Sequence, residues 1–90
     1  MNYRTVYTKH ARADLAALDE KISGRIVNKI RYFRLSGDPL SYAKVLKGGY
    51  AGKYRFRIGD YRAIFKIDGK GNIKILMILR IKHRKDVYGL

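Results

Sequence analysis

The sequence predicts one α+β domain of element order β-α-α-β-β-β, in which a helical hairpin packs on one face of an antiparallel sheet. Apolar residues recur at helical spacing between residues 9 and 36, and they alternate with polar residues between residues 54 and 81. The chain has 90 residues, which suffices for one hydrophobic core but not for two. Residues 1–90 are therefore predicted to form a single domain.

The first half of the chain is predicted to hold one strand and two helices. Residues 1–7 are rich in Tyr, Thr and Val, which favour a strand. Thr8 and Asp19 can each cap a helix, and Gly37 followed by Asp38-Pro39 ends the second one. The apolar stripes of the two helices consist of Ala11, Leu15 and Leu18, and of Ile22, Ile26, Ile30 and Phe33.

The second half is predicted to form three antiparallel strands after a Gly-containing connection over residues 40–52. The strands cover residues 54–58, 61–67 and 73–81, separated by turns at Gly59-Asp60 and at residues 68–72. A two-residue turn at Gly59-Asp60 places Arg57 opposite Arg62. One face then carries the core residues Tyr54, Phe56, Ile58, Tyr61, Ala63, Phe65 and Ile67, and the other carries Arg55, Arg57, Arg62 and Lys66.

Composition narrows the class of function. Lys and Arg number 21 against 7 Asp and Glu, a formal net charge of +14, which favours a polyanionic partner such as RNA, DNA or an acidic protein. The absence of cysteine excludes disulfides, thiol catalysis and Cys-based zinc sites, and the two histidines are too few for a zinc cage. No export signal or spanning segment is recognisable, so a cytoplasmic location is expected.

The basic face of the predicted sheet is a candidate anion site. Like charges directly opposite each other, as in the pair of Arg57 and Arg62, destabilise a sheet unless an anion lies between them. Alternate positions in and just beyond the last strand also carry cations, namely Arg80, Lys82 and Arg84. Two separate segments can therefore line one basic surface. The alternative is a solvated outer face that happens to be rich in Lys and Arg.

Two motifs together carry a family resemblance. Gly-Lys-Tyr-Arg-Phe-Arg-Ile-Gly-Asp-Tyr-Arg-Ala-Ile-Phe at residues 52–65, followed by Leu-Arg-Ile-Lys-His-Arg-Lys-Asp-Val-Tyr at residues 79–88, resembles the RelE/ParE toxin superfamily, in particular its RelE branch. The resemblance extends over nearly the whole chain, and it implies the small fold of RelE toxins, which is similar to that of microbial ribonucleases.

The resemblance also implies a function. RelE-like toxins enter the ribosomal A site and cut mRNA there without metal or other cofactor, by attack of the 2′-hydroxyl on the adjacent phosphate. A RelB-like antitoxin holds them in check, and the pair usually represses its own operon, so contact with operator DNA is expected only through that complex. The expected partners are therefore the antitoxin, the ribosome with its rRNA, and mRNA.

The family's site residues carry over to named positions of this chain. Arg55 and Arg57 stand where relatives have a basic pair, often lysine, and Arg62 occupies the arginine of the Gly-x-Tyr-Arg motif. Arginine can stabilise the charge that builds on a phosphorane. The carboxy-terminal motif supplies the remaining catalytic candidates, and its flanking cations join others as expected RNA contacts. The catalytic candidates are Arg55, Arg57, Arg62, Arg84, Tyr88 and His83, and the RNA-binding candidates are Lys53, Lys66, Arg80, Lys82 and Lys85.

The general base and the exact branch stay open at the level of sequence. Arginine hardly ever deprotonates, so the base is His83, Tyr88 or a group of the ribosome. Lys82 stands where relatives often have Gly, which alters the approach of the last segment. Two other functions fit the same fold: a ParE-like inhibitor of DNA gyrase, and a catalytically inactive relative that only binds nucleic acid.

Overall fold

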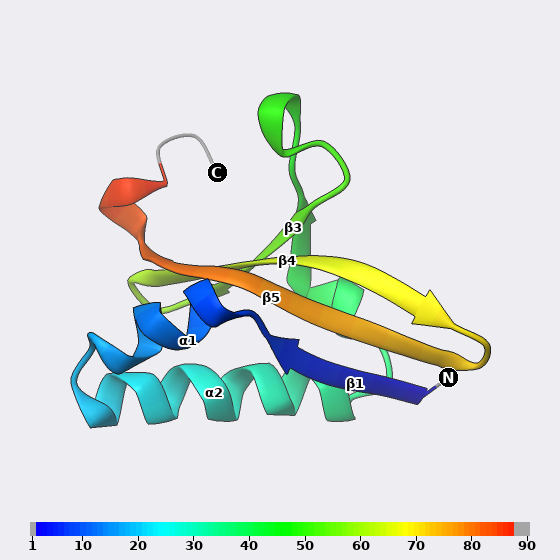
Figure 1. Ribbon diagram of the computed structural model, residues 1–90, viewed down its shortest axis with the longest axis horizontal. Coiled ribbons are helices and arrows are strands. Elements are labelled where there is room, and N and C mark those ends of the chain that lie inside the picture. Colours follow the sequence, from blue (N-terminus) through cyan, green and yellow to red (C-terminus); the bar gives the residue numbers. More distant parts are fainter. Residues whose placement is uncertain (1, 88–90) are drawn as a thin grey trace.

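The computed structural model describes residues 2–87, except for the side chain of Lys70, and shows two helices on one face of a five-stranded sheet (Figure 1). The helices are α1 (Lys9–Ala16) and α2 (Glu20–Leu35). The strands are β1 (Asn2–Tyr7), β2 (Ala43–Val45), β3 (Tyr54–Ile58), β4 (Tyr61–Lys70) and β5 (Ile73–His83). Three short 3-10 helices complete the chain: η1 (Pro39–Tyr42), η2 (Gly48–Tyr50) and η3 (Arg84–Asp86). The predicted α+β class is confirmed.

Both helices begin at the residues that the sequence indicates. The Thr8 hydroxyl accepts a hydrogen bond from the amide of Ala11 at 3.1 Å, and the Asp19 carboxylate accepts one from the amide of Lys21 at 2.9 Å. Gly37 follows α2 with a φ of +84°, a conformation that glycine adopts without strain. The hairpin therefore forms where predicted, although α1 ends two residues earlier than the pattern suggests.

The sheet differs from the prediction at its edges and in one hairpin. The strand β4 continues to Lys70, so the turn predicted over residues 68–72 shortens to Gly71-Asn72. The order of the sheet is β1-β5-β4-β3-β2, and the edge strand β1 runs parallel to β5, so the sheet is antiparallel only from β5 to β2. The long helical excursion after β1 permits a parallel pairing, and the strand pattern itself carries no direction. The strand β2 lies in the segment predicted as a connection, because three residues are too few to show an alternation.

The main core lies between the helices and the sheet. Phe56 and Phe65 stack at 4.2 Å between ring centroids, and Phe33 of α2 lies 4.7 Å from Phe56. The turn at Gly59-Asp60 sets the register as predicted, with Ile58 opposite Tyr61 and Arg57 opposite Arg62. All seven residues predicted for the core face contribute to this core, Tyr54 and Tyr61 among them.

A β-bulge in β5 interrupts the regular alternation that the sequence predicts for residues 73–81. Ile64 pairs with Arg80 whereas Phe65 pairs with Ile78, so Leu79 is the extra residue. Ile78 before the bulge and Ile81 after it both enter the main core. The bulge therefore shifts the parity of β5 and places Lys82 opposite Arg62, on the face away from the helices.

Candidate active site

The face of the sheet away from the helices carries a group of arginines from two distant segments. Arg55 and Arg57 come from β3 and Arg62 from β4, on the positions that alternate with the core residues. Lys82 of β5 lies opposite Arg62 in the ladder and therefore on the same face. Together with Arg84 of η3, the residues Arg55, Arg57 and Arg62 are called the arginine cluster below.

Arg62 lies at the centre of the arginine cluster. The residue is only 9% exposed, and its Nη1 donates hydrogen bonds to the carbonyl oxygens of Gly59 and Tyr61, both at 2.9 Å. Burial, followed by repulsion from Arg57, Arg55 and Arg84, lowers the pKa of Arg62 from its ordinary value. Because the other three guanidinium groups repel Arg62, all four lie near one another and create a positive potential there. This potential favours the binding of an anion.

Arg84 is tied to the β3–β4 turn by two contacts. Its backbone amide donates to the carbonyl oxygen of Asp60 at 2.7 Å, and its Nε lies 3.5 Å from Oδ1 of the same residue. The carboxy-terminal motif therefore meets the turn that holds Arg62, as the two-segment prediction requires. Asp60 is a site neighbour that the sequence analysis treated only as a turn residue, although its place between arginine-rich stretches was a usable signal.

Arg55 contributes an unsatisfied donor to the arginine cluster. Its Nε is buried and has no hydrogen-bond partner among the described residues. A buried donor without an acceptor costs about 1–3 kcal/mol, so such groups usually have a partner. The unmet Nε therefore adds to the free-energy cost of holding the arginine cluster together.

A small apolar cluster brings two loops onto the basic face. Leu46 after β2, Ile64 of β4 and Val87 after η3 are all buried and contact one another. The segment around η2 and the segment around η3 both rise from the side of the sheet opposite the helices (Figure 1). The basic face is therefore partly covered and shaped by packed chain, and it is not a bare solvated surface.

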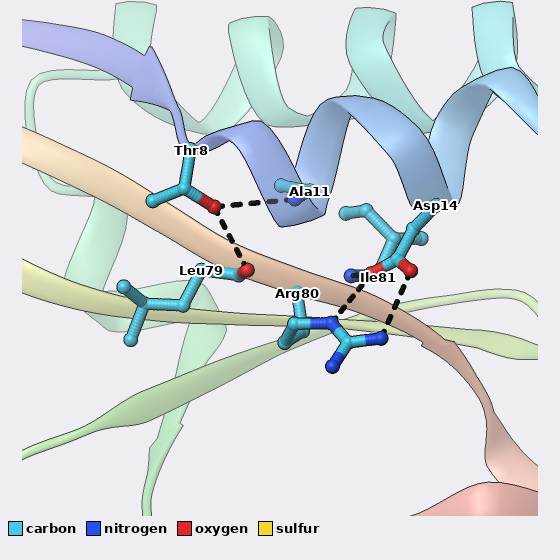
Figure 2. Close-up of polar contacts among 6 residues, drawn as sticks. All are labelled: Thr8, Ala11, Asp14, Leu79, Arg80 and Ile81. Atoms are coloured by element: carbon cyan, nitrogen blue, oxygen red, sulfur yellow. Dashed lines mark hydrogen bonds and ion pairs between the residues drawn. The ribbon is translucent and has the colours of Figure 1, made fainter.

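Arg80 has a structural partner on α1. Its Nε and Nη2 donate to the two carboxylate oxygens of Asp14 at 2.9 and 3.0 Å, and the amide of Ile81 donates to the same carboxylate at 2.9 Å (Figure 2). The hydrogen bond from Arg80 is the largest of the effects that lower the pKa of Asp14. Asp14 escaped the sequence analysis, although it lies three residues after the buried Ala11, on the same side of α1.

His83 lies on the opposite face of the sheet from the arginine cluster. It pairs with Tyr61, which packs against the main core, and its ring meets the Tyr61 ring edge-on at 5.2 Å. With Ile22, Arg25 and Ile26 of α2 it lines a cavity of about 160 Å³ that the β3–β4 turn closes. The structure thus does not bring His83 together with the arginines.

The remaining predicted residues are spread around this site. Lys66 shares the face of Arg62 but lies two alternate positions further along β4, opposite Met77. Lys53 is half-buried directly before β3, and Lys85 is exposed in η3. Tyr88 lies outside the described residues. Within residues 2–87, no three His, Asp or Glu side chains gather in a way that could hold a metal ion, and no helix is long and apolar enough to cross a membrane.

Comparison with known proteins places the chain in a family. A family model described as the ParE toxin of the type II toxin–antitoxin system parDE matches residues 5–88. The curated Toxin RelG of Mycobacterium tuberculosis is 35% identical over 88 residues, which cover 98% of each chain.

Two solved complexes have a similar fold. One chain of the toxin–antitoxin complex RelBE2 from Mycobacterium tuberculosis has a TM-score of 0.73 at 32% identity, covering 93% of this chain and 100% of that one. One chain of the RelB–RelE complex from Methanococcus jannaschii has a TM-score of 0.66 at 28% identity, covering 93% and 95%. The model match and the RelG identity over almost the full length show that this chain belongs to the RelE/ParE superfamily of type II toxin–antitoxin toxins.

Proposed function

We propose that this toxin is a ribosome-dependent endoribonuclease that cuts mRNA in the ribosomal A site and so inhibits translation. The observation that carries the proposal is the arginine cluster, in which a buried Arg62 receives the repulsion of Arg55, Arg57 and Arg84. Such a constellation is costly in the free protein and is relieved by a phosphate. The relatives named RelG and RelE support the same branch of the superfamily.

The proposed reaction needs charge stabilisation more than covalent chemistry from the protein. The 2′-oxygen attacks the adjacent phosphorus, the bond from phosphorus to the 5′-oxygen breaks, and the products carry a 2′,3′-cyclic phosphate and a 5′-hydroxyl. Arg62 and Arg84 hold the non-bridging oxygens, where negative charge increases in the transition state. Arg55 and Arg57 bind the flanking phosphates, and Lys53, Lys66, Lys82 and Lys85 add longer-range attraction for RNA.

Two proton transfers complete the proposed reaction. The 2′-hydroxyl loses a proton and the 5′-oxygen gains one, and the arginines cannot serve as the base because they do not deprotonate. The proposed base is either Tyr88 or a group of the ribosome, since His83 lies on the other face of the sheet. Replacing Tyr88 with Phe separates them: a loss of cleavage of more than about 100-fold assigns proton transfer to the tyrosine hydroxyl.

The test of the nuclease is cleavage of mRNA on purified, programmed ribosomes, with the new 3′ end identified chemically. Arg62→Ala and Arg84→Ala are each expected to lower the rate by about 10²–10³-fold, because each removes a donor to the developing charge. Arg31→Ala is the matched control, since Arg31 is an exposed arginine of α2 on the far side of the sheet. Thermal melting of each variant shows that the fold is retained.

Two outcomes would contradict the nuclease. One is full cleavage by a folded double variant lacking both Arg62 and Arg84. The other is a gyrase-dependent DNA-damage response with uncut mRNA, which would favour the ParE activity that gives the matching family model its name. A protein that binds RNA but yields no cut product would be the inactive relative.

The proposal includes an antitoxin partner. A RelB-like chain is expected to place acidic residues over Arg55, Arg57 and Arg62 and apolar residues along the helices, because the toxin has a net charge of +14. The solved relatives from Mycobacterium tuberculosis and Methanococcus jannaschii are themselves toxin–antitoxin complexes. Co-expression with the neighbouring small gene is expected to give a complex that survives purification, and failure to co-purify would count against the partner.

A further inference from the structure

The imidazole of His83 caps the short turn that carries Arg84. His83 precedes η3, and its Nδ1 accepts a hydrogen bond from the backbone amide of Lys85 at 3.1 Å. This is the arrangement of a helix N-cap, in which a side-chain acceptor satisfies an amide that the turn itself leaves free. The acceptor at residue 83 therefore helps to set the conformation of η3 and the direction of the Arg84 side chain, together with the contacts between Arg84 and Asp60.

This contact fixes the protonation state that His83 must have. A backbone amide can only donate, so Nδ1 must offer its lone pair, and the proton of the neutral ring then lies on Nε2. Neither nitrogen keeps a free lone pair in that tautomer, so the ring cannot act as a general base as it stands. The edge-on contact with Tyr61 holds the ring on the helix-covered side of the sheet.

We propose that His83 is a positioning residue, which in its neutral form orders the η3 turn and so aims Arg84 at the scissile phosphate. The inference rests on the nuclease proposed above and assigns His83 a place in it other than proton transfer. Removing the acceptor at residue 83 leaves the Lys85 amide without its partner, and the cap is lost.

Several charged or titratable groups surround this ring. Arg25 of α2, Asp60 of the β3–β4 turn and Tyr61 of β4 line the cavity that His83 also lines. Lys82, Arg84 and Lys85 adjoin it along the chain. The carbonyl and carboxylate of Asp60 contact Arg84 independently of the imidazole, so the turn has a second attachment that persists when the cap is lost.

The test compares His83→Asn with His83→Ala. The Oδ1 of asparagine occupies the place of Nδ1 and accepts the same hydrogen bond, but the amide cannot take up a proton as a base would. Cleavage by the Asn variant is expected to stay within about threefold of the parent. The Ala variant is expected to be roughly tenfold slower, because a misplaced Arg84 no longer meets the transition state.

A double variant decides whether His83 acts through Arg84. In an Arg84→Ala background, His83→Ala is expected to cause no additional loss, since both changes remove the same interaction. An additional loss in that background, or an Asn variant as slow as the Ala variant, overturns the proposal and returns the imidazole to proton transfer. Thermal melting confirms that the variants remain folded.

A readout without RNA separates this inference from the nuclease. The nitrogen chemical shifts of His83 in the parent protein report the tautomer, and hydrogen exchange reports the protection of the Lys85 amide. A proton on Nε2 of the neutral ring, and protection of the Lys85 amide that is kept in the Asn variant and lost in the Ala variant, support the cap even if no mRNA is cut. A proton on Nδ1 of the neutral ring overturns it even if cleavage is efficient.

Discussion

The two faces of the sheet are built from the same strands but satisfy opposite physical demands. In β3, Phe56 and Ile58 enter an aromatic core, whereas Arg55 and Arg57 at the alternate positions join the arginine cluster. The covered face gains stability from burial. The open face accumulates an unpaired buried Nε and a repulsion between arginines, and a bound polyanion would relieve that repulsion. Adjacent residues of one strand thus serve different roles, one in the stability of the core and the next in the charge of the open face.

The largest effect is expected on the covered face. Phe56→Ala removes a fully buried ring that stacks on Phe65 and Phe33, and it should lower the free energy of unfolding by about 3–5 kcal/mol. Chemical denaturation measures this loss. Arg57→Ala, the next residue along β3, is the control on the open face and should change stability by less than about 1 kcal/mol. Equal losses at the two positions would break the division between the faces.

A smaller loss is expected where α1 meets β5. Asp14→Ala removes the acceptor of three hydrogen bonds, from Arg80 and the Ile81 amide, and should cost about 1–3 kcal/mol. These contacts lower the pKa of Asp14, so its stabilising contribution is present above the ordinary carboxyl pKa and is lost as the pH falls through acid. Denaturation of parent and variant at pH 7 and in acid should therefore converge, and a constant gap would contradict this account.

Alkaline pH should weaken the covered face through Tyr7. Burial, partly offset by Arg34, raises the pKa of Tyr7 to about 12. In the unfolded chain this phenol ionises near pH 10, so the folded state keeps a proton that the unfolded state loses. Stability is then unaffected below pH 10 and falls by about 1 kcal/mol as the pH rises towards 12, after allowance for partial exposure. Tyr7→Phe should abolish this particular loss when the parent and variant are melted side by side.

The smallest effect has the opposite sign and belongs to the open face. Arg57→Gln removes one member of the like-charged pair with Arg62, and it should raise stability by a few tenths of a kcal/mol while it weakens RNA binding. Thermal melting and RNA titration at low salt measure the two quantities. The gain should vanish at high salt, because screening removes the repulsion. A loss of stability in the Gln variant would show that the pair is not repulsive in the folded protein.

The parts of the molecule that follow local rules could be predicted from the sequence. The caps at Thr8 and Asp19 and the two-residue turn at Gly59-Asp60 depend on neighbouring residues only, and the turn alone places Arg57 opposite Arg62. The two faces of β3 and β4 follow directly from that register.

The parts that depend on distant pairing could not be predicted. Residues 75–79 are all apolar, at odd and even positions alike, so their pattern does not indicate that Leu79 forms the bulge. The face of His83 depends on the register of β4 against β5 beyond that bulge, whereas the two-residue turn at Gly71-Asn72 sets the register only before it. The parallel attachment of β1 and the contact of Asp14 with Arg80 likewise join residues more than 60 positions apart.

The pairing of β1 with β5 has a consequence for how the chain matures. The strand Asn2–Tyr7 can join the sheet only when its partner Ile73–Ile78 is present. The strand β1 therefore pairs only after β5 has been synthesised. The completed toxin therefore cannot assemble while its own carboxy-terminal strand is still being made. The nuclease proposed above would in this way not act on the ribosome that is producing it.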